Sequence, residues 1–396
     1  MDRLAIKLED VITFQNFFDA LKDCNKGVNY KYSVQEYNAN CATYITKTIN
    51  SILEGKIPEV KNTKLVVIYE RGKRRIITPI DIRDRITQKV LCEKVLIPSI
   101  VPHLIYDNGA SMKGKGTEFA RKRVNNFIEK AKREYGADNL YALVFDFKSY
   151  FDSIPHEQCY KILKQYLYDE RLINLTIGII ESYKLHSINS IKNEERREEA
   201  LRKLYAHEDV GICLGSQISQ IMAVAVPNRF DHYIKDVLKL KYYERYMDDG
   251  VIILNDKKKL LEIKRRLEYV AESCGLHFNQ KKTRIVKVTK GFTFLKLKYR
   301  TNAKCRTIKA LVHSGIVRER RKLKKFYTKV IFGEMSLDDI YNNVQSWNAH
   351  AKIAKCYNTV KSMFKLYDKL FGGYRITRLY YNTHQDIKRK KKVLRI

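Results

Sequence analysis

The segment that most constrains the fold is YERYMDDGVIIL (243–254), in which two adjacent aspartates interrupt a run of aromatic and β-branched residues. Such runs on both sides of a short polar stretch predict two strands joined by a tight turn, with Gly250 helping the chain to turn. By itself, an Asp-Asp-Gly sequence is most often only a turn. Two carboxylates inside an otherwise buried hairpin are costly, however, so they call for a partner.

A further carboxylate lies upstream in VFDFKSYFDSIP, where Asp146 ends the apolar run LYALVFDF. An unbroken apolar run of this length is typical of a strand that is covered on both faces. If the sheet brings Asp146 next to Asp248, the two charges repel each other unless a cation lies between them. Mg²⁺ is bound by one or two carboxylates together with substrate phosphates, and two such ions can hold the attacking and leaving oxygens of a phosphoryl transfer. The pair therefore favours a metal site over a simple turn.

The charge of the chain points to a polyanionic partner. Its 77 Lys and Arg residues face 44 Asp and Glu residues, which gives a formal net charge of +33. This excess indicates a nucleic acid first and an anionic membrane surface second. The sequence has no apolar run of membrane-spanning length and no signal-peptide core, so we expect a cytoplasmic protein without a membrane partner. The eight cysteines form no C-x-x-C pair and no zinc-type cluster, which predicts reduced thiols.

The periodicity of the remaining sequence predicts an α+β fold. Before residue 60 we expect helices, one of them opened by a capping box at Ser33. A strand, a turn around Gly72, a second strand and a helix from about Asp84 should follow. A helix is then expected over 157–186, and more helices near 257–274 and from His313 onward. The order of elements through 140–300 indicates an antiparallel sheet with helices on one face.

Three stretches, FDFKSYFDSIPH, the YMDD hairpin and HFNQKKTRIVKVTKGFTFLKLKY, resemble the palm motifs of reverse transcriptases. The resemblance covers roughly residues 65–360 and implies a right-hand polymerase. It would have fingers with an N-terminal helical extension at 1–139 and an RRM-like antiparallel palm at 140–312, with a helical, finger-side insertion at 157–210. A helical thumb and a basic tail would form 313–396. The implied activity is RNA-directed DNA polymerisation by two-metal-ion nucleotidyl transfer.

The resemblance also assigns the catalytic residues. In the family, an Asp of the first palm motif and the first Asp of the hairpin bind both catalytic metal ions, and these match Asp146 and Asp248. Asp249 completes the acidic triad, and the backbone carbonyl of Phe147 is a further metal ligand. The implied cofactor is a pair of Mg²⁺ ions, with Mn²⁺ as a substitute. Lys282 matches the family lysine that protonates the leaving pyrophosphate, and its neighbour Lys281 is the alternative.

Further matches concern the incoming nucleotide. Phe151 corresponds to the aromatic steric gate that collides with a 2′-hydroxyl and so selects deoxynucleotides, although a core position is the alternative. The stretches RGKRRIITP and MKGKG resemble fingers motifs whose cations hold the triphosphate. Lys73 with Arg74 or Arg75 are the candidates for that role, because compact cations stabilise charge that shifts to the leaving pyrophosphate.

The sequence departs from intron-encoded relatives at GICLGSQISQ, where those relatives have Pro-Gln-Gly followed by Ser-Pro. Leu214 and Gly215, followed by Gln220, are similar to the pattern of diversity-generating retroelement enzymes and of unclassified, defence-associated bacterial reverse transcriptases. Leu offers only apolar contact where Gln can hydrogen-bond, so we predict relaxed base selection. A second departure is Lys296, which stands where many relatives have Gly in the primer-grip turn.

Exposed lysines are the expected contacts to nucleic acid. Lys113 and Lys115 lie in a Gly/Lys-rich loop, and further lysines lie off the apolar stripe of the expected thumb, where they could face phosphates: Lys355, Lys365 and Lys369. The stripe itself we interpret as core. The terminal IKRKKKVLRI is either a basic arm on RNA or a solvated tail.

The leading functional prediction is a polymerase that copies a cognate structured non-coding RNA into DNA, in a retroelement or an anti-phage defence system. Its partners would be that RNA template, a DNA primer or cDNA product, and dNTPs. One alternative is a diversity-generating enzyme that makes mutagenic cDNA with a small accessory protein. Template-independent or protein-primed synthesis is another. A non-catalytic RNA-binding protein is disfavoured, because a disused metal site would leave unpaired acidic groups.

Overall fold

The computed structural model describes residues 4–58, 66–70, 73–77, 79–189, 193–206, 208–302, 306–354, 356–372 and 374. The chain forms two compact units. The first comprises Met1–Val124, Phe145–Ile252 and Lys257–Arg284, and the second comprises Asn125–Val144, Ile253–Asp256 and Ile285–Ile396. Each unit is described by itself below.

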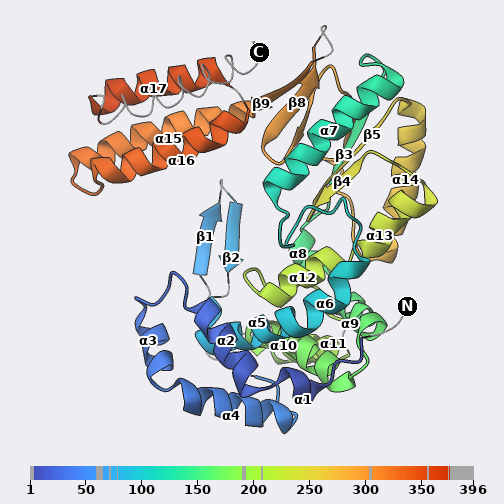
Figure 1. Cartoon of the computed structure of the whole chain (residues 1–396), viewed down its shortest axis with the longest axis vertical. Helices are drawn as coiled ribbons and strands as arrows, with labels where there is room; N and C mark the ends of the chain where they lie inside the picture. Colours follow the sequence, from blue (N-terminus) through green and yellow to red (C-terminus); the bar gives the residue numbers. More distant parts are fainter. Residues whose placement is uncertain are drawn as a thin grey trace, which may run out of the picture. The chain divides into compact units, whose positions relative to one another are not determined.

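The first unit begins with helices, as the sequence predicts (Figure 1). They are α1 (Leu8–Val11), α2 (Phe14–Cys24), α3 (Tyr32–Ala39) and α4 (Cys41–Leu53). The Thr13 hydroxyl caps α2 by accepting a hydrogen bond from the Asn16 N–H at 3.3 Å. The capping box expected at Ser33 is wrong: α3 begins at Tyr32, one residue earlier, so Ser33 lies inside the first turn and cannot act as its cap.

The two strands and the helix predicted for this segment are confirmed, and the turn expected around Gly72 lies outside the described residues. Strands β1 (Val66–Glu70) and β2 (Lys73–Ile77) pair antiparallel, and α5 (Ile82–Leu91) follows. The Asp81 carboxylate caps α5 by accepting from the Arg83 N–H at 3.0 Å. The chain continues through short helical segments into a long helix: η1 (Cys92–Leu96), α6 (Ile97–Ile100), η2 (Val101–His103) and α7 (Thr117–Tyr135).

A four-stranded sheet carries the predicted hairpin. Its strand order is β4 (Tyr243–Tyr246), β5 (Asp249–Leu254), β3 (Tyr141–Asp146) and β6 (Arg284–Lys287). Strands β4 and β5 pair antiparallel, with Tyr246 opposite Asp249. This register leaves Met247 and Asp248 unpaired as a two-residue turn at the tip of the hairpin.

Helices separate the strands of this sheet along the chain. They are α8 (Tyr150–Ser153), α9 (His156–Tyr166), α10 (Glu170–Asn189), α11 (Glu194–Tyr205), α12 (Gln217–Ala225), α13 (Asn228–His232), η3 (Tyr233–Val237) and α14 (Lys257–Ser273). The single helix expected over 157–186 is therefore two helices, because the chain after Tyr166 is extended before it re-enters a helix at Glu170. The helix expected at 257–274 is confirmed.

The second unit contains a three-stranded sheet and a group of helices. Strands β7 (Phe292–Phe294), β8 (Leu297–Thr301) and β9 (Thr307–Leu311) pair antiparallel in sequence order. Helices α15 (His313–Ile331), α16 (Leu337–Ile353) and α17 (Tyr357–Phe371) pack against one another (Figure 1). The predicted apolar stripe is divided between α16 and α17, and its members Val360, Phe364 and Tyr367 are buried.

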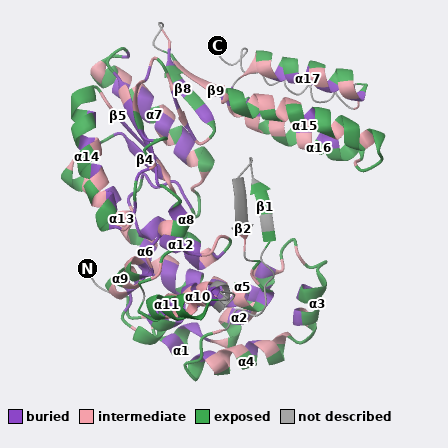
Figure 2. Ribbon diagram, turned by 180° about the vertical axis from the view of Figure 1, so that it is seen from behind, coloured by how far each residue is buried: buried purple, intermediate pink, exposed green. Residues whose placement is uncertain are grey.

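Aromatic residues form the core behind the hairpin. The ring of Phe145 stacks on Phe278 at 5.0 Å and meets Phe230 edge-on at 5.6 Å. Buried residues follow the strands of this sheet and helix α12 (Figure 2). The sequence suggested that Gly250 helps to form the turn, but the residue lies inside β5, where it pairs with Arg245. A Cβ atom at Gly250 would lie 2.1 Å from Cζ of Phe145, so the glycine makes room for that ring.

Candidate active site

The hairpin turn and the end of β3 lie next to each other. Met247 and Asp248 form the turn, and Met247 has a left-handed backbone with φ of 53°. The Phe147 N–H, one residue beyond β3, donates a hydrogen bond to the Asp248 carbonyl at 3.1 Å. Together with the pairing of β5 with β3 in the sheet, this bond places Asp146 and the two aspartates of the hairpin in one small region of the first unit.

Asp146 is held by the segment that follows α14. Its side chain is buried, with 5% of the residue exposed. The Asn279 N–H donates to the Asp146 carbonyl at 2.7 Å, and the Asn279 side-chain amide donates to Oδ1 of the carboxylate at 3.2 Å. The Lys282 ammonium forms an ion pair with Oδ2. Both carboxylate oxygens therefore point toward donors from one short loop.

The electrostatics of the site reflect several carboxylates at close range. The pKa of Asp249 is raised to about 7, chiefly by burial and then by the charges of Asp248 and Asp146, while Lys282 opposes the shift. Partial burial acts to lower the pKa of Lys282, but the hydrogen bond to Asp146 and the charges of all three aspartates outweigh it, so that pKa lies above its usual value. The acidic groups thus attract a cation to this site, and Lys282 is the cation now beside them.

The donor set fits a hard divalent cation. Carboxylate oxygens are the ligands that Mg²⁺ and Mn²⁺ prefer, and an added cation would relieve the repulsion that raises the pKa of Asp249. In the part of the chain that the structure describes, no three His, Cys, Asp or Glu side chains are gathered closely enough to count as a ready-made metal cluster. The Lys282 ammonium is paired with Oδ2 of Asp146, so a metal ion bound at that oxygen would compete with it.

The expected nucleotide-contacting residues occupy neighbouring segments. Phe151 lies in α8 and is half-buried, which disfavours the alternative that it is a core residue. Its carbonyl accepts a hydrogen bond from the Ile212 N–H at 2.8 Å, so α8 lies beside the segment that leads to Leu214. Leu214 is half-buried and Gly215, with φ of 110°, is exposed, as is Gln220 on α12.

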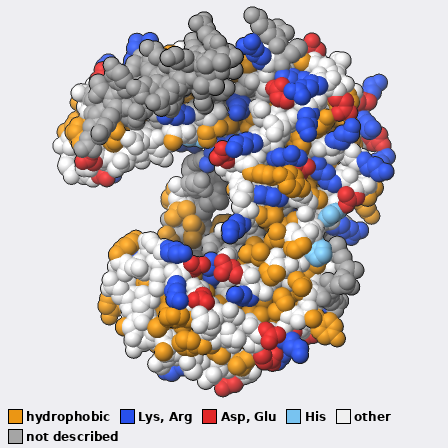
Figure 3. All heavy atoms as spheres, in the orientation of Figure 1, with side chains coloured by type: hydrophobic (Ala, Val, Ile, Leu, Met, Phe, Trp, Pro, Cys, Tyr) orange, Lys and Arg blue, Asp and Glu red, His pale blue; other side chains and the backbone are white. Residues whose placement is uncertain are grey.

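The expected nucleic-acid contacts differ in their surroundings. Lys113 is exposed, whereas the Lys115 ammonium donates to the Tyr106 carbonyl at 2.7 Å and lies 5.3 Å from the ring centroid of Phe119. Lys115 thus braces its own loop. Lysines and arginines are spread over the face shown in Figure 3. Lys365 and Lys369 are exposed on α17. Outside the described residues lie Lys355, the tail 387–396, and the side chains of Lys73, Arg74 and Arg75.

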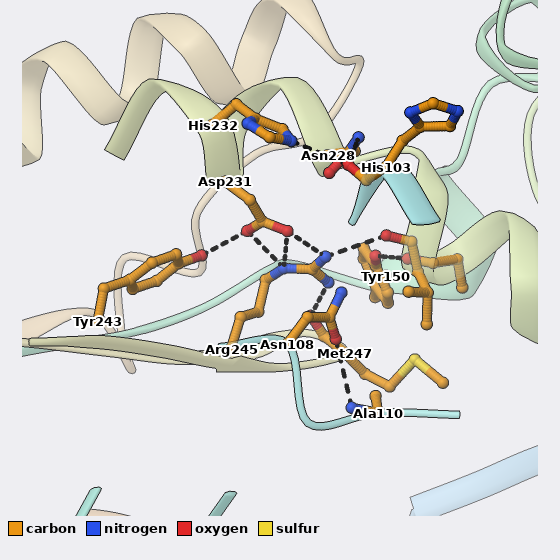
Figure 4. Close-up of polar contacts among 12 residues, drawn as sticks. His103, Asn108, Ala110, Tyr150, Asn228, Asp231, His232, Tyr243, Arg245 and Met247 are labelled. Atoms are coloured by element: carbon orange, nitrogen blue, oxygen red, sulfur yellow. Dashed lines mark hydrogen bonds and ion pairs between the residues drawn. The ribbon is translucent and has the colours of Figure 1, made fainter. Parts of the chain in front are cut away.

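Two groups of residues around the site were not anticipated from the sequence. One is Asn279, which stands three residues before Lys282 in FNQKKT and binds Asp146 twice. The other is the buried ion pair of Arg245 with Asp231, shown in Figure 4. The signal available for the second was an arginine beside Glu244 in a strand that the sequence predicts to be buried, since a charge in such a strand needs a buried partner.

A separate set of hydrogen bonds fixes the start of α12. The Ser216 hydroxyl donates to Oε1 of the buried Gln88 at 2.8 Å, and Nε2 of Gln88 donates to the Tyr183 hydroxyl at 2.6 Å. The same Ser216 oxygen accepts from the Ser219 N–H at 3.2 Å and so caps α12. This chain of bonds anchors the residue directly after the Leu214–Gly215 turn.

The comparison with known families decides the class of the protein. The family model described as reverse transcriptase (RNA-dependent DNA polymerase) matches residues 60–299, more than half of the chain. The chain belongs to the reverse transcriptase family. Among curated protein sequences, none matches the chain as a relative.

Membership of this family establishes the activity as RNA-directed DNA polymerisation. A reverse transcriptase acts on an RNA template, a primer and dNTPs, and such enzymes generally use divalent metal ions. Within the described residues, no helix is both long enough and apolar enough to cross a membrane.

Proposed function

We propose that this reverse transcriptase copies a cognate structured non-coding RNA into cDNA by two-metal-ion nucleotidyl transfer with Mg²⁺. The observation that carries the proposal is the acidic site itself, in which Asp249 has a raised pKa caused by burial and by two neighbouring aspartates. In this proposal the chain is a right-hand polymerase, with fingers at 1–139, palm at 140–312 and thumb at 313–396.

Each residue of the site has a role in that chemistry. The carboxylates of Asp146, Asp248 and Asp249 and the carbonyl of Phe147 would hold two Mg²⁺ ions, or Mn²⁺ in their place. Bound there, the ions supply the positive charge that stabilises the attacking 3′-oxygen and the leaving phosphates. Lys282, which carries a proton and faces the same carboxylates, gives that proton to the leaving pyrophosphate.

Phe151 and basic residues of β2 act on the incoming nucleotide in this proposal. Phe151 excludes the 2′-hydroxyl of ribonucleotides, and Lys73 with Arg74 or Arg75 binds the triphosphate. Leu214, Gly215 and Gln220 contact the nascent base pair. Because the Leu214 side chain offers no hydrogen bond, Leu214→Gln should lower the misincorporation rate on a fixed template, measured by sequencing the cDNA. An unchanged error rate would remove Leu214 from base selection.

The biological role that we propose is anti-phage defence or a retroelement. The support is the net charge of +33, which suits a large RNA partner, and exposed lysines such as Lys113, Lys365 and Lys369. The Leu214-Gly215 pattern is equally in keeping with a diversity-generating enzyme that works with a small accessory protein. A repeat pair of template and variable sequence beside the gene would favour that second candidate.

The test is to sequence the nucleic acids that co-purify with the wild-type protein and with Asp248→Ala, both expressed from the native operon. A single co-purified RNA, with complementary DNA present only for the wild type, is the expected result and identifies the template. RNA without DNA in both samples would contradict cDNA synthesis under these conditions. DNA unrelated to the co-purified RNA would favour template-independent or protein-primed synthesis.

A further inference from the structure

A buried ion pair lies behind the catalytic hairpin. The side chains of Arg245 on β4 and Asp231 on α13 are both fully buried, with 0% exposed. Nε of Arg245 donates to Oδ1 of Asp231 at 2.8 Å, and Nη2 donates to Oδ2 at 2.6 Å (Figure 4). The Tyr243 hydroxyl donates to the same Oδ1 at 2.6 Å. The carboxylate is therefore satisfied on both oxygens.

The remaining guanidinium donors reach backbone carbonyls on two other elements. Nη1 donates to the carbonyl of Met247 in the hairpin turn at 3.0 Å, and Nη2 also donates to the carbonyl of Val224 in α12 at 3.0 Å. The preceding carbonyl of α12, that of Ala223, accepts a hydrogen bond from the Tyr150 hydroxyl. The Arg245 side chain thus joins Met247 in the hairpin turn to α12, the helix that follows the Leu214–Gly215 turn.

Stability alone does not explain this arrangement. A buried ion pair is often no more stabilising than well-packed apolar residues of the same volume, because both charges lose their hydration. The register of β4 is already fixed by its pairing with β5. What the guanidinium adds is a bond to Met247, which lies outside the paired positions and has a left-handed backbone.

We propose that Arg245 is a positioning residue for the catalytic hairpin. Held by Asp231, it fixes the Met247 carbonyl and thereby the direction of the Asp248 carboxylate, and it couples the hairpin to α12. A lysine cannot replace it, because a single ammonium lacks the planar fork that reaches a carboxylate and two carbonyls together. This inference rests on the proposed role of Asp248 in binding the catalytic metal.

The test uses two sets of variants of the full-length protein. Arg245→Lys keeps the charge on Asp231 but gives up the fork. The triple variant Arg245→Met, Asp231→Leu, Tyr243→Phe removes the whole polar group and replaces it with apolar side chains of similar size. The matched control is Arg266, which is exposed on α14 and forms an ion pair with Glu262 one helical turn away. It is changed to Arg266→Lys and to Arg266→Met.

Three quantities are measured for each variant. They are the melting temperature, the kcat and KM for single-nucleotide incorporation on an annealed RNA template and DNA primer over a range of Mg²⁺ concentrations, and hydrogen exchange of the 243–254 amides in metal-free protein. For Arg245→Lys and the triple variant we expect kcat to fall about 10- to 100-fold with a smaller change in KM, as for other residues that orient metal ligands. A higher Mg²⁺ requirement and faster exchange in the hairpin should accompany this loss, while the Arg266 variants match wild type.

A triple variant that melts near the wild-type temperature and keeps wild-type kcat, Mg²⁺ dependence and hairpin exchange would overturn the proposal. If the triple variant does not fold, Arg245→Lys decides, and wild-type kinetics in that variant overturn it equally. Asp248→Asn is measured in parallel to separate the proposed role of Asp248 from the inference about Arg245. Full activity of Asp248→Asn removes the proposed role of Asp248, whereas an inactive Asp248→Asn beside fully active Arg245 variants removes only the inference about Arg245.

Discussion

Two hairpins of this chain turn without a glycine, and they do so in different ways. In β7–β8, Leu295 and Lys296 both have positive φ, 44° and 67°. Two residues in this conformation form the turn that best suits the twist of paired strands. In β4–β5 only Met247 has positive φ, and its carbonyl is bonded to the buried Arg245. The β7–β8 turn thus contains two left-handed residues, whereas the β4–β5 turn contains one, whose carbonyl is held by a side chain of β4 that is itself paired with the buried Asp231.

The two turns differ in what sets their geometry and in what they present. The β4–β5 turn presents Asp248 to the proposed metal site, so its geometry is set by a buried network. The β7–β8 turn carries an exposed Lys296 at a position where many relatives have Gly. Changes in the β4–β5 hairpin should therefore affect chemistry or core packing, and changes in the β7–β8 turn should affect only the folding free energy.

The largest effect is expected for Asp248→Asn. Loss of one anionic metal ligand should reduce single-nucleotide incorporation by about 1,000-fold or more, which is the scale for removing a group that stabilises transition-state charge. The melting temperature should not fall, because the substitution also relieves the repulsion that contributes to the raised pKa of Asp249. Incorporation is measured on an annealed RNA template and DNA primer, with Asp256→Asn, an exposed aspartate just before α14, as the control. Incorporation within a few-fold of wild type would exclude Asp248 as a metal ligand.

A smaller effect, on stability, is expected for Gly250→Ala. The new Cβ would lie 2.1 Å from Cζ of Phe145, so the ring has to move in a packed core. Overpacking of this kind typically lowers the free energy of unfolding by about 1–3 kcal/mol. Urea denaturation measures the change. Gly315→Ala on α15, where a Cβ meets nothing within 4 Å, should instead stabilise its helix by about 0.5–1 kcal/mol. Equal stability of Gly250→Ala and wild type would mean that the ring contact is not tight.

The pH dependence of stability should depend on Glu244, which is fully buried in β4. The pKa of Glu244 is raised to about 9, chiefly by burial and then by the charge of Asp107, while nearby cations oppose the shift. The folded state therefore binds a proton that the unfolded state releases above its ordinary pKa near 4.5. Between these two values stability falls as pH rises, by at most about 1.4 kcal/mol per pH unit.

Glu244→Gln removes this titration, so its free energy of unfolding should fall less between pH 6 and pH 8 than that of the wild type. Denaturant titrations at several pH values measure the two slopes. Glu262→Gln, on the exposed side of α14, serves as the control and should keep the wild-type slope. Parallel slopes for Glu244→Gln and wild type would show that Glu244 is ionised in the folded protein.

Local patterns predicted much of the fold. The strands at 66–77, the helix after Asp81 and the helix at 257–273 follow from alternation, periodicity and capping residues within a few positions of each other. The wrong predictions at Gly250 and Ser33 involve other causes. The position of Gly250 is explained by Phe145, which is far away in sequence, and α3 starts at Tyr32, two residues before the start that a cap at Ser33 implies.

The residues of the candidate site also divide into those that local sequence predicts and those that it does not. The YMDD motif and the upstream FDF identified Asp146, Asp248 and Asp249 because their spacing and β-rich flanks are carried in the sequence itself. Asn279 and Arg245 were missed because their partners become visible only when β3, β4 and α13 are brought together. Contacts between segments remote in sequence leave little local signal, apart from a charged residue in a strand that should be apolar.

The smallest effect is expected at the β7–β8 turn. Lys296 has φ of 67°, a left-handed conformation that costs a residue with a Cβ about 1 kcal/mol and costs glycine almost nothing. Lys296→Gly should therefore raise the free energy of unfolding by about 0.5–1 kcal/mol, less the entropy that glycine adds to the unfolded chain. Lys298→Gly, at an exposed position two residues later inside β8, is the matched control and should lower it by about 0.5–1 kcal/mol. Incorporation kinetics should stay at the wild-type level for Lys296→Gly. A loss of activity in a variant that is more stable would mean that the Lys296 side chain contacts the primer, and the two hairpins would then share a catalytic role.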